Sequence, residues 1–80
     1  MDKDQLEKIR AAEQTFPRVT LWEKNGKSRL YVNECGYITK DQNDVYGRAN
    51  GYFKGFYYQY SKPGKVSVLR DIIRVITPED

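Results

Sequence analysis

The sequence predicts an α+β fold, in which an N-terminal helix packs on a twisted antiparallel sheet of about five strands, mostly in meander order. Two observations predict it: apolar residues recur at helical spacing before Pro17, and from Arg18 onward they alternate with a period of two. The chain of 80 residues is long enough for one small α+β domain, residues 1–80, with a narrow margin of stability.

The first segment is predicted to be a helix that ends at Pro17. Asp2 is a suitable N-cap, and Gln5 stands at the reciprocal position of a capping box. The helix carries a narrow apolar stripe made of Leu6, Ile9, Ala12 and Phe16. We expect Leu6, Ile9 and Phe16 to pack against the apolar residues of the first two strands, namely Val19, Leu21, Leu30 and Val32.

Residues 18–32 are predicted to form a β-hairpin around Asn25-Gly26, because both residues of this turn must take positive φ and Asn-Gly does so readily. A two-residue loop sets the register: Leu21 lies opposite Leu30 and Val19 opposite Val32 on one face. Trp22 then meets Arg29, and Thr20 meets Tyr31, on the other face. We expect a cation–π contact between Trp22 and Arg29, or a binding anchor at Trp22.

The next segment is predicted to contain two short strands, Tyr37–Thr39 and Val45–Tyr46, joined by the polar turn Lys40–Asp44 after a corner at Gly36. The acidic residues of this turn do not have the spacing of a calcium-binding loop, so we expect a plain Asn/Asp turn. Asn50-Gly51 is expected to form another tight turn.

Between Val45 and Arg70 the chain has no acidic residue and many aromatic and basic ones. We expect one strand over Tyr52–Tyr60, joined by a type II turn at Pro63-Gly64 to a strand starting at Val66. One face of the long strand would then carry Tyr52, Lys54, Phe56, Tyr58 and Tyr60 as an exposed stacking surface. A bulge at Gly55 would invert half of this arrangement.

The tail over residues 66–76 fits both a helix and two short strands. Val66, Leu69, Ile73 and Ile76 have helical spacing, whereas the many β-branched residues favour strands. We expect a strand, a turn and a strand.

The charge distribution favours an acidic partner. The net charge is +3, yet residues 1–17 carry −1 and residues 75–80 carry −2, so the middle of the chain carries 3 + 1 + 2 = +6. The single cysteine, Cys35, excludes an intramolecular disulfide, and the absence of histidine excludes the usual zinc ligand sets. No segment resembles a signal peptide or a membrane span, so we expect a cytoplasmic protein that does not bind membranes.

Catalysis is not expected, because histidine, the usual partner for activating a cysteine such as Cys35, is absent and no carboxylate pair or phosphate-binding loop stands out. The sequence favours a non-enzymatic module, without cofactor or metal, that binds single-stranded DNA or RNA as a monomer or homodimer. The residues expected to make contact are Trp22, Arg29, Arg48, Tyr52, Lys54, Phe56, Tyr58, Tyr60, Lys62 and Lys65. The alternative is a small protein-binding inhibitor or accessory protein, for example of a phage or mobile element, that docks on or masks a nucleic-acid-handling partner.

Overall fold

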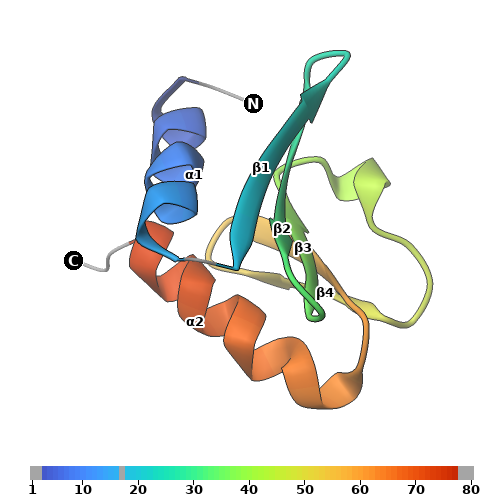
Figure 1. The fold of residues 1–80 in the computed structure, drawn as a ribbon. Helices are drawn as coiled ribbons and strands as arrows, with labels where there is room; N and C mark the ends of the chain where they lie inside the picture. The colour runs from blue at the N-terminus through green and yellow to red at the C-terminus, as the bar shows by residue number, and fades with distance from the viewer. Residues whose placement is uncertain (1–2, 17, 78–80) are drawn as a thin grey trace.

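The computed structural model describes residues 3–16 and 18–77 and has the predicted α+β fold. Helix α1 (Lys3–Thr15) precedes strands β1 (Val19–Lys24), β2 (Lys27–Val32), β3 (Gly36–Thr39), β4 (Asn50–Phe53) and β5 (Phe56–Tyr60), and helix α2 (Val66–Ile76) follows them. The antiparallel sheet has the order β1-β2-β3-β5-β4, so only the exchange of β4 and β5 departs from a meander (Figure 1).

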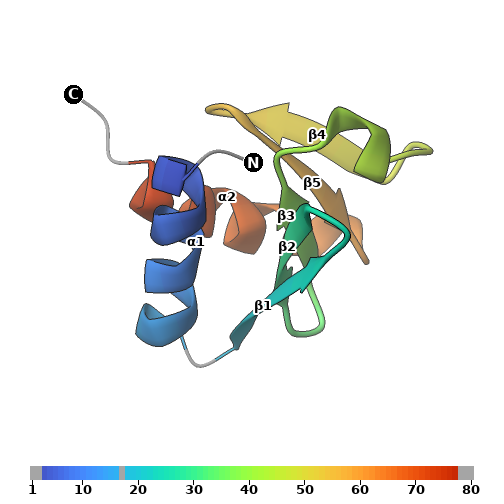
Figure 2. The ribbon, with the colours of Figure 1, turned by 90° about the horizontal axis from the view of Figure 1, so that it is seen from above.

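Both helices lie on the same side of the sheet, which leaves the molecule with two layers and its core between them (Figure 2). Helix α1 supplies Ile9 and Ala12 to this core, and α2 supplies Leu69 and Ile73. From the sheet come the buried side chains of Val19, Leu30, Val32, Ile38, Phe56 and Tyr58. Neither helix of the described chain is long and apolar enough to cross a membrane.

The first hairpin has the predicted register. Val19 lies opposite Val32, Leu21 opposite Leu30 and Trp22 opposite Arg29. The turn residues Asn25 and Gly26 both have positive φ, as the two-residue loop requires. Phe16 and Leu21 are packed against the core as expected, whereas the side chain of Leu6 lies outside the described part of α1.

The prediction of two strands in the tail is wrong, since residues 66–76 form α2. A short 3-10 turn at Pro63–Lys65 leads into this helix, so Pro63-Gly64 does not form the predicted type II hairpin turn. Four side chains of α2 are buried at helical spacing, namely Leu69, Ile72, Ile73 and Ile76. Burying this stripe outweighs the modest helix propensity of β-branched residues.

The single strand predicted over Tyr52–Tyr60 is also wrong, because the chain reverses at Lys54-Gly55 and forms the β4–β5 hairpin. Lys54 and Gly55 have φ of 51° and 91°, the backbone of a tight hairpin turn. Phe53 lies opposite Phe56, and both face the helices. The predicted exposed surface is therefore partly core: Phe56 is 1% exposed and Tyr58 is 3% exposed.

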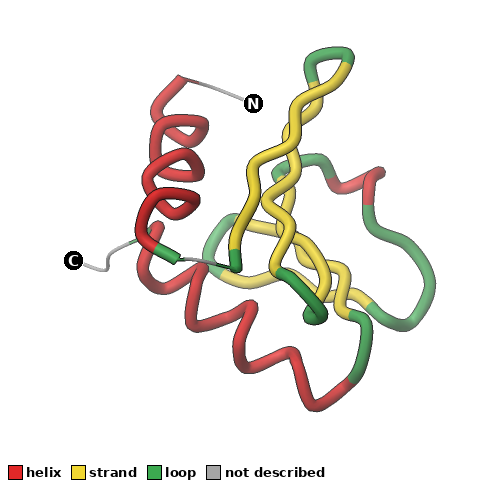
Figure 3. Tube along the Cα trace, viewed as in Figure 1, coloured by secondary structure: helices red, strands yellow, loops and turns green. Residues whose placement is uncertain are grey.

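The segment between β3 and β4 differs from its prediction as well. Val45–Tyr46 is not a strand, and Gln42–Asp44 forms a 3-10 turn. Asp41 caps this turn by accepting a hydrogen bond from the Asn43 backbone N–H at 2.9 Å. Asn50-Gly51 is not a turn but the start of β4, which lies at one edge of the sheet. Figure 3 shows the segment before it as a long loop in green that contains the 3-10 turn in red.

Candidate binding surface on the outer face of the sheet

The face of the sheet that points away from both helices, called the outer face below, carries most of the exposed aromatic surface of the described chain. By strand register it comprises Thr20, Trp22, Arg29, Tyr31, Tyr37, Thr39, Asn50, Tyr52, Tyr57 and Gln59. Of these rings, Trp22 is 39% exposed, Tyr31 37% and Tyr52 58%. Loop 40–49 crosses this face and adds Tyr46, the most exposed ring of the described residues.

Arg29 organises one half of the outer face. Its guanidinium lies 4.3 Å from the centroid of the Tyr37 ring, 5.7 Å from that of Trp22 and 6.0 Å from that of Tyr31. The contact between Arg29 and Trp22 confirms the predicted cation–π pair. Arg29 also donates a hydrogen bond of 2.9 Å to the Tyr31 hydroxyl. This cluster holds Trp22 and Tyr31 in fixed positions at the surface.

Asp44 of loop 40–49 neutralises Arg29. Arg29 Nε donates to Asp44 Oδ2 at 2.6 Å, and Arg29 Nη2 donates to Asp44 Oδ1. The hydrogen bond to Asp44 raises the pKa of Arg29 further above its ordinary value. The charge of Arg29 is therefore matched within the protein, and the centre of the aromatic cluster is close to neutral.

Loop 40–49 is tied to the outer face at several points. The Tyr37 hydroxyl donates to the Asp44 carbonyl, and burial raises the pKa of this phenol. The Tyr46 backbone N–H donates to Gln59 Oε1 at 3.2 Å. Asp41 forms an ion pair with Lys27 at 3.2 Å, and its pKa is lowered first by the hydrogen bond from Asn43 and then by Lys27. The acidic residues of this loop thus hold the loop in place, and the described chain contains no group of three or more His, Cys, Asp or Glu able to hold a metal ion.

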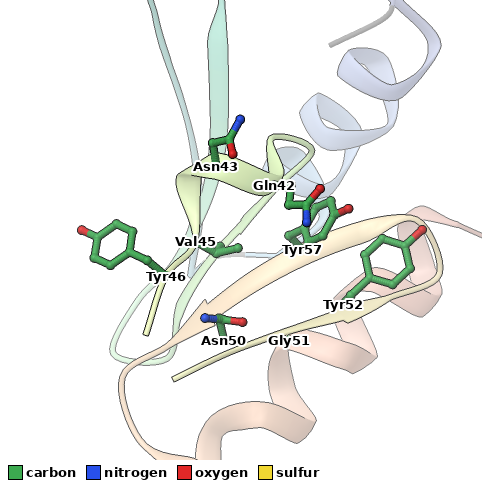
Figure 4. A pocket seen from close by; sticks show the side chains of 8 residues that line it. All are labelled: Gln42, Asn43, Val45, Tyr46, Asn50, Gly51, Tyr52 and Tyr57. Carbon is green, nitrogen blue, oxygen red and sulfur yellow. The ribbon is translucent and has the colours of Figure 1, made fainter. Parts of the chain in front are cut away.

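A pocket of about 480 Å³ lies on the other side of loop 40–49, next to β4 (Figure 4). Its lining combines rings and side-chain amides, from Gln42, Asn43, Val45, Tyr46, Asn50, Gly51, Tyr52 and Tyr57. The Tyr52 and Tyr57 rings contact each other with centroids 4.6 Å apart. The outer face therefore has two aromatic regions, one around Arg29 and one at this pocket.

Several cations gather at one end of the sheet, the lower end in Figure 1. Backbone hydrogen bonds bring their segments together: Asn33 N–H donates to the Arg18 carbonyl, Tyr60 N–H to the Ala49 carbonyl next to Arg48, and Ser61 N–H to the Cys35 carbonyl. The cations at this end are Arg18, Arg48, Lys62 and Lys65, and the described residues form no ion pair with them. Glu34 of the β2–β3 turn lies at the same end, where its carbonyl accepts a hydrogen bond from the Ser61 hydroxyl, so one acidic residue stands among these cations.

The structure separates the predicted site residues into groups. Trp22, Arg29 and Tyr52 lie on the outer face, and Arg48, Lys62 and Lys65 lie at its basic end. Lys54 belongs to the β4–β5 turn at the opposite end. Phe56 and Tyr58 are in the core, and the Tyr58 hydroxyl accepts hydrogen bonds from Arg70 at 2.9 and 3.1 Å. Tyr60 is half-buried on the helix side.

The list of predicted contact residues left out Tyr31, Tyr37 and Tyr46. The hairpin register places Tyr31 on the same face as Trp22, so this ring could have been included from the sequence. Tyr37 could not, because its face depends on the register between β2 and β3, and Tyr46 could not, because its position depends on how loop 40–49 crosses the sheet. Comparison of the chain with protein families, with curated proteins and with solved structures found no match.

Proposed function

We propose that this protein is a non-catalytic module that binds single-stranded nucleic acid on the outer face of its sheet. The observation that carries the proposal is the set of exposed rings, Trp22, Tyr31, Tyr46 and Tyr52, on the face that neither helix covers. Bases stack on such rings with about 1 to 3 kcal/mol each, with little dependence on base identity. Three of these rings, Trp22, Tyr31 and Tyr52, stand on paired strands, so they lose little conformational entropy on binding.

The charges around this face support a phosphate-bearing partner. Asp41 and Asp44 are neutralised by Lys27 and Arg29, so they oppose an anion weakly. Arg18 and Arg48 stand at the basic end of the face with Lys62 and Lys65. A strand that stacks on Trp22 and Tyr31 would have its phosphates within the field of these cations. A cytoplasmic location, which is part of this proposal, is supported by the free and buried thiol of Cys35.

Titration with labelled single strands tests the proposal. We expect binding of a mixed-sequence DNA or RNA strand whose log–log dependence on salt has a slope of about −2 to −3, as for three or four phosphate contacts. Trp22→Ala should weaken binding by about 1 to 3 kcal/mol. Val75→Ala is the matched control, because Val75 is an exposed side chain on α2, away from the outer face. Absence of binding to either nucleic acid at low salt would overturn the proposal.

A protein partner is the second candidate, and the Arg29 cluster is the observation that favours it. Trp, Tyr and Arg dominate the binding energy of protein interfaces. The pairing of Arg29 with Asp44 leaves a rigid aromatic cluster whose charge is largely balanced. In this case the protein would be an inhibitor or accessory protein that masks a nucleic-acid-handling partner. Its binding would depend on Trp22 but only weakly on salt.

A further inference from the structure

The two edges of the sheet differ in how their backbone hydrogen-bonding groups are used. Along an edge strand, every second residue bonds the neighbouring strand and the others direct their N–H and C=O groups outward. At the β1 edge, the bond from Asn33 N–H to the Arg18 carbonyl shows that Arg18 bonds the β2 side. Val19, Leu21 and Glu23 therefore direct their backbone groups away from β2. Val19 N–H donates to the Phe16 carbonyl at 3.2 Å, and Leu21 N–H donates to the Glu13 carboxylate at 2.5 Å. Helix α1 and the residue that follows it thus occupy two of the three outward N–H groups of this edge, those of Val19 and Leu21.

The β4 edge has no such cover. Here the bond from Tyr60 N–H to the Ala49 carbonyl shows that Ala49 bonds the β5 side, and by the same alternation so do Gly51 and Phe53. Asn50 and Tyr52 therefore direct their backbone N–H and C=O groups outward. No residue in the described ranges forms a hydrogen bond with these outward backbone groups. Figure 2 shows β4 at the margin of the sheet, where its inward-facing Phe53 lies against Arg70 and Arg74 of α2. An open strand edge of this kind is a template for adding another strand.

We infer that β4 is a self-association edge, at which two copies of this chain pair antiparallel through their β4 strands. A two-fold axis at Gly51 places Asn50 of each copy opposite Tyr52 of the other. Both pairs then exchange N–H···O=C bonds, which satisfies all the outward groups of Asn50 and Tyr52 in both copies. This inference does not depend on nucleic-acid binding.

The side chains next to this edge are complementary in the same register. Asn50 lines the pocket of about 480 Å³ on the outer face, and Tyr52, two residues along the strand, is 58% exposed. Side chains directly opposite each other across an antiparallel pair share one face and have Cβ atoms about 4.5 to 5.5 Å apart. The Tyr52 side chain of each copy is therefore the direct neighbour of Asn50 of the other, at the rim of its pocket. A second copy fits this edge because one surface supplies both the ring and the pocket.

The interface is small, since β4 has four residues, and its association is accordingly weak. Sedimentation velocity over a range of protein concentrations up to about 1 mM tests it, because an association of about 4 kcal/mol is visible there. We expect the mass to rise from 9.4 kDa towards twice this value. A mass of 9.4 kDa at the highest concentration overturns the inference and leaves the edge to a different partner.

Amide hydrogen exchange locates the contact. The Asn50 and Tyr52 amides should become protected as the concentration rises. The Glu23 amide is the internal control, because it faces outward on the β1 edge, where it should exchange at an unchanged rate. A dimer in which the Asn50 and Tyr52 amides stay unprotected contradicts the assignment to β4.

A pair of matched variants completes the test. Tyr52→Lys removes the ring and places like charges close together across the two-fold axis, so it should weaken association by about 10-fold or more. Trp22→Lys makes the same change to an exposed ring near the β1 edge and should leave association unchanged. Unfolding temperatures close to that of the parent protein show that both variants are folded. Unchanged association of a folded Tyr52→Lys variant overturns the inference.

Discussion

Arg29 on β2 and Asp44 at the end of the 3-10 turn form a two-point ion pair next to the exposed rings of the outer face. The side chain of Asp44 is 8% exposed and that of Arg29 is 25% exposed. The pair joins the sheet to loop 40–49 and fixes the cation over which Trp22, Tyr31 and Tyr37 are arranged. Both the shape of the aromatic surface and its charge depend on this contact.

Asp44→Asn should lower the free energy of unfolding by about 1 to 3 kcal/mol, because it leaves a partly buried guanidinium without its counter-charge. Chemical denaturation measures the effect. Asp71→Asn is the control, since Asp71 forms an exposed ion pair with Arg74 on α2, and such pairs contribute about 0 to 1 kcal/mol. Equal effects of the two substitutions would show that the Arg29–Asp44 pair does not anchor the loop.

Gly26→Val should cost about 1 to 3 kcal/mol of stability, because Gly26 has a φ of 77° that a β-branched residue resists. No heavy atom lies within 4 Å of a Cβ at this position, so backbone strain is the whole effect. Thermal unfolding is the measurement. Gly64→Val is a control in equally open space without a positive φ, and a similar loss in both variants would contradict the hairpin turn.

Phe56→Ala should destabilise the protein by about 3 to 5 kcal/mol, because its fully buried ring would leave a cavity in the core. Tyr52→Ala should change stability by about 0.5 kcal/mol or less, because this ring is exposed. The two rings lie on opposite faces of the same hairpin. Unfolding midpoints measured on both variants show which ring points into the core. A larger loss of stability for Tyr52→Ala than for Phe56→Ala would mean that β4 and β5 present the opposite faces to the core.

Tyr37 should make stability sensitive to alkaline pH. Burial raises the pKa of Tyr37 in the folded state, so the folded protein holds this proton more tightly than the unfolded chain does. The contribution of Tyr37 to the free energy of unfolding is fully present below pH of about 10, the ordinary pKa of tyrosine. This contribution is lost as pH rises through the raised pKa of the folded state.

Tyr37→Phe removes this titration and should flatten the alkaline limb of the stability curve. At neutral pH the same substitution should cost about 1 to 3 kcal/mol, because the Asp44 carbonyl loses the hydrogen bond from the Tyr37 hydroxyl. Denaturation at a series of pH values compares the two proteins. Parallel curves above pH of about 10 would contradict the assignment to Tyr37.

The candidate site was only partly predictable from the sequence. Trp22 and Arg29 were placed together correctly, because a two-residue turn transmits its register to the strands on both sides. Phe56 and Tyr58 were placed wrongly on the surface. Their facing depends on the turn at Lys54-Gly55, where Lys54 has positive φ without being one of the residues that signal such a turn.

The sequence by itself determined the parts of the fold whose signals act over a few residues: the helix before Pro17, the Asn25-Gly26 hairpin and its alternating faces. Only the tertiary structure decided that residues 66–76 form a helix and that loop 40–49 crosses the outer face. The helix follows from burying Leu69, Ile72, Ile73 and Ile76 against α1 and the sheet, which outweighs the strand preference of the β-branched residues in this segment. The loop follows from the pairing of Asp44 with Arg29, two charges that come together only once β2 and β3 are in place.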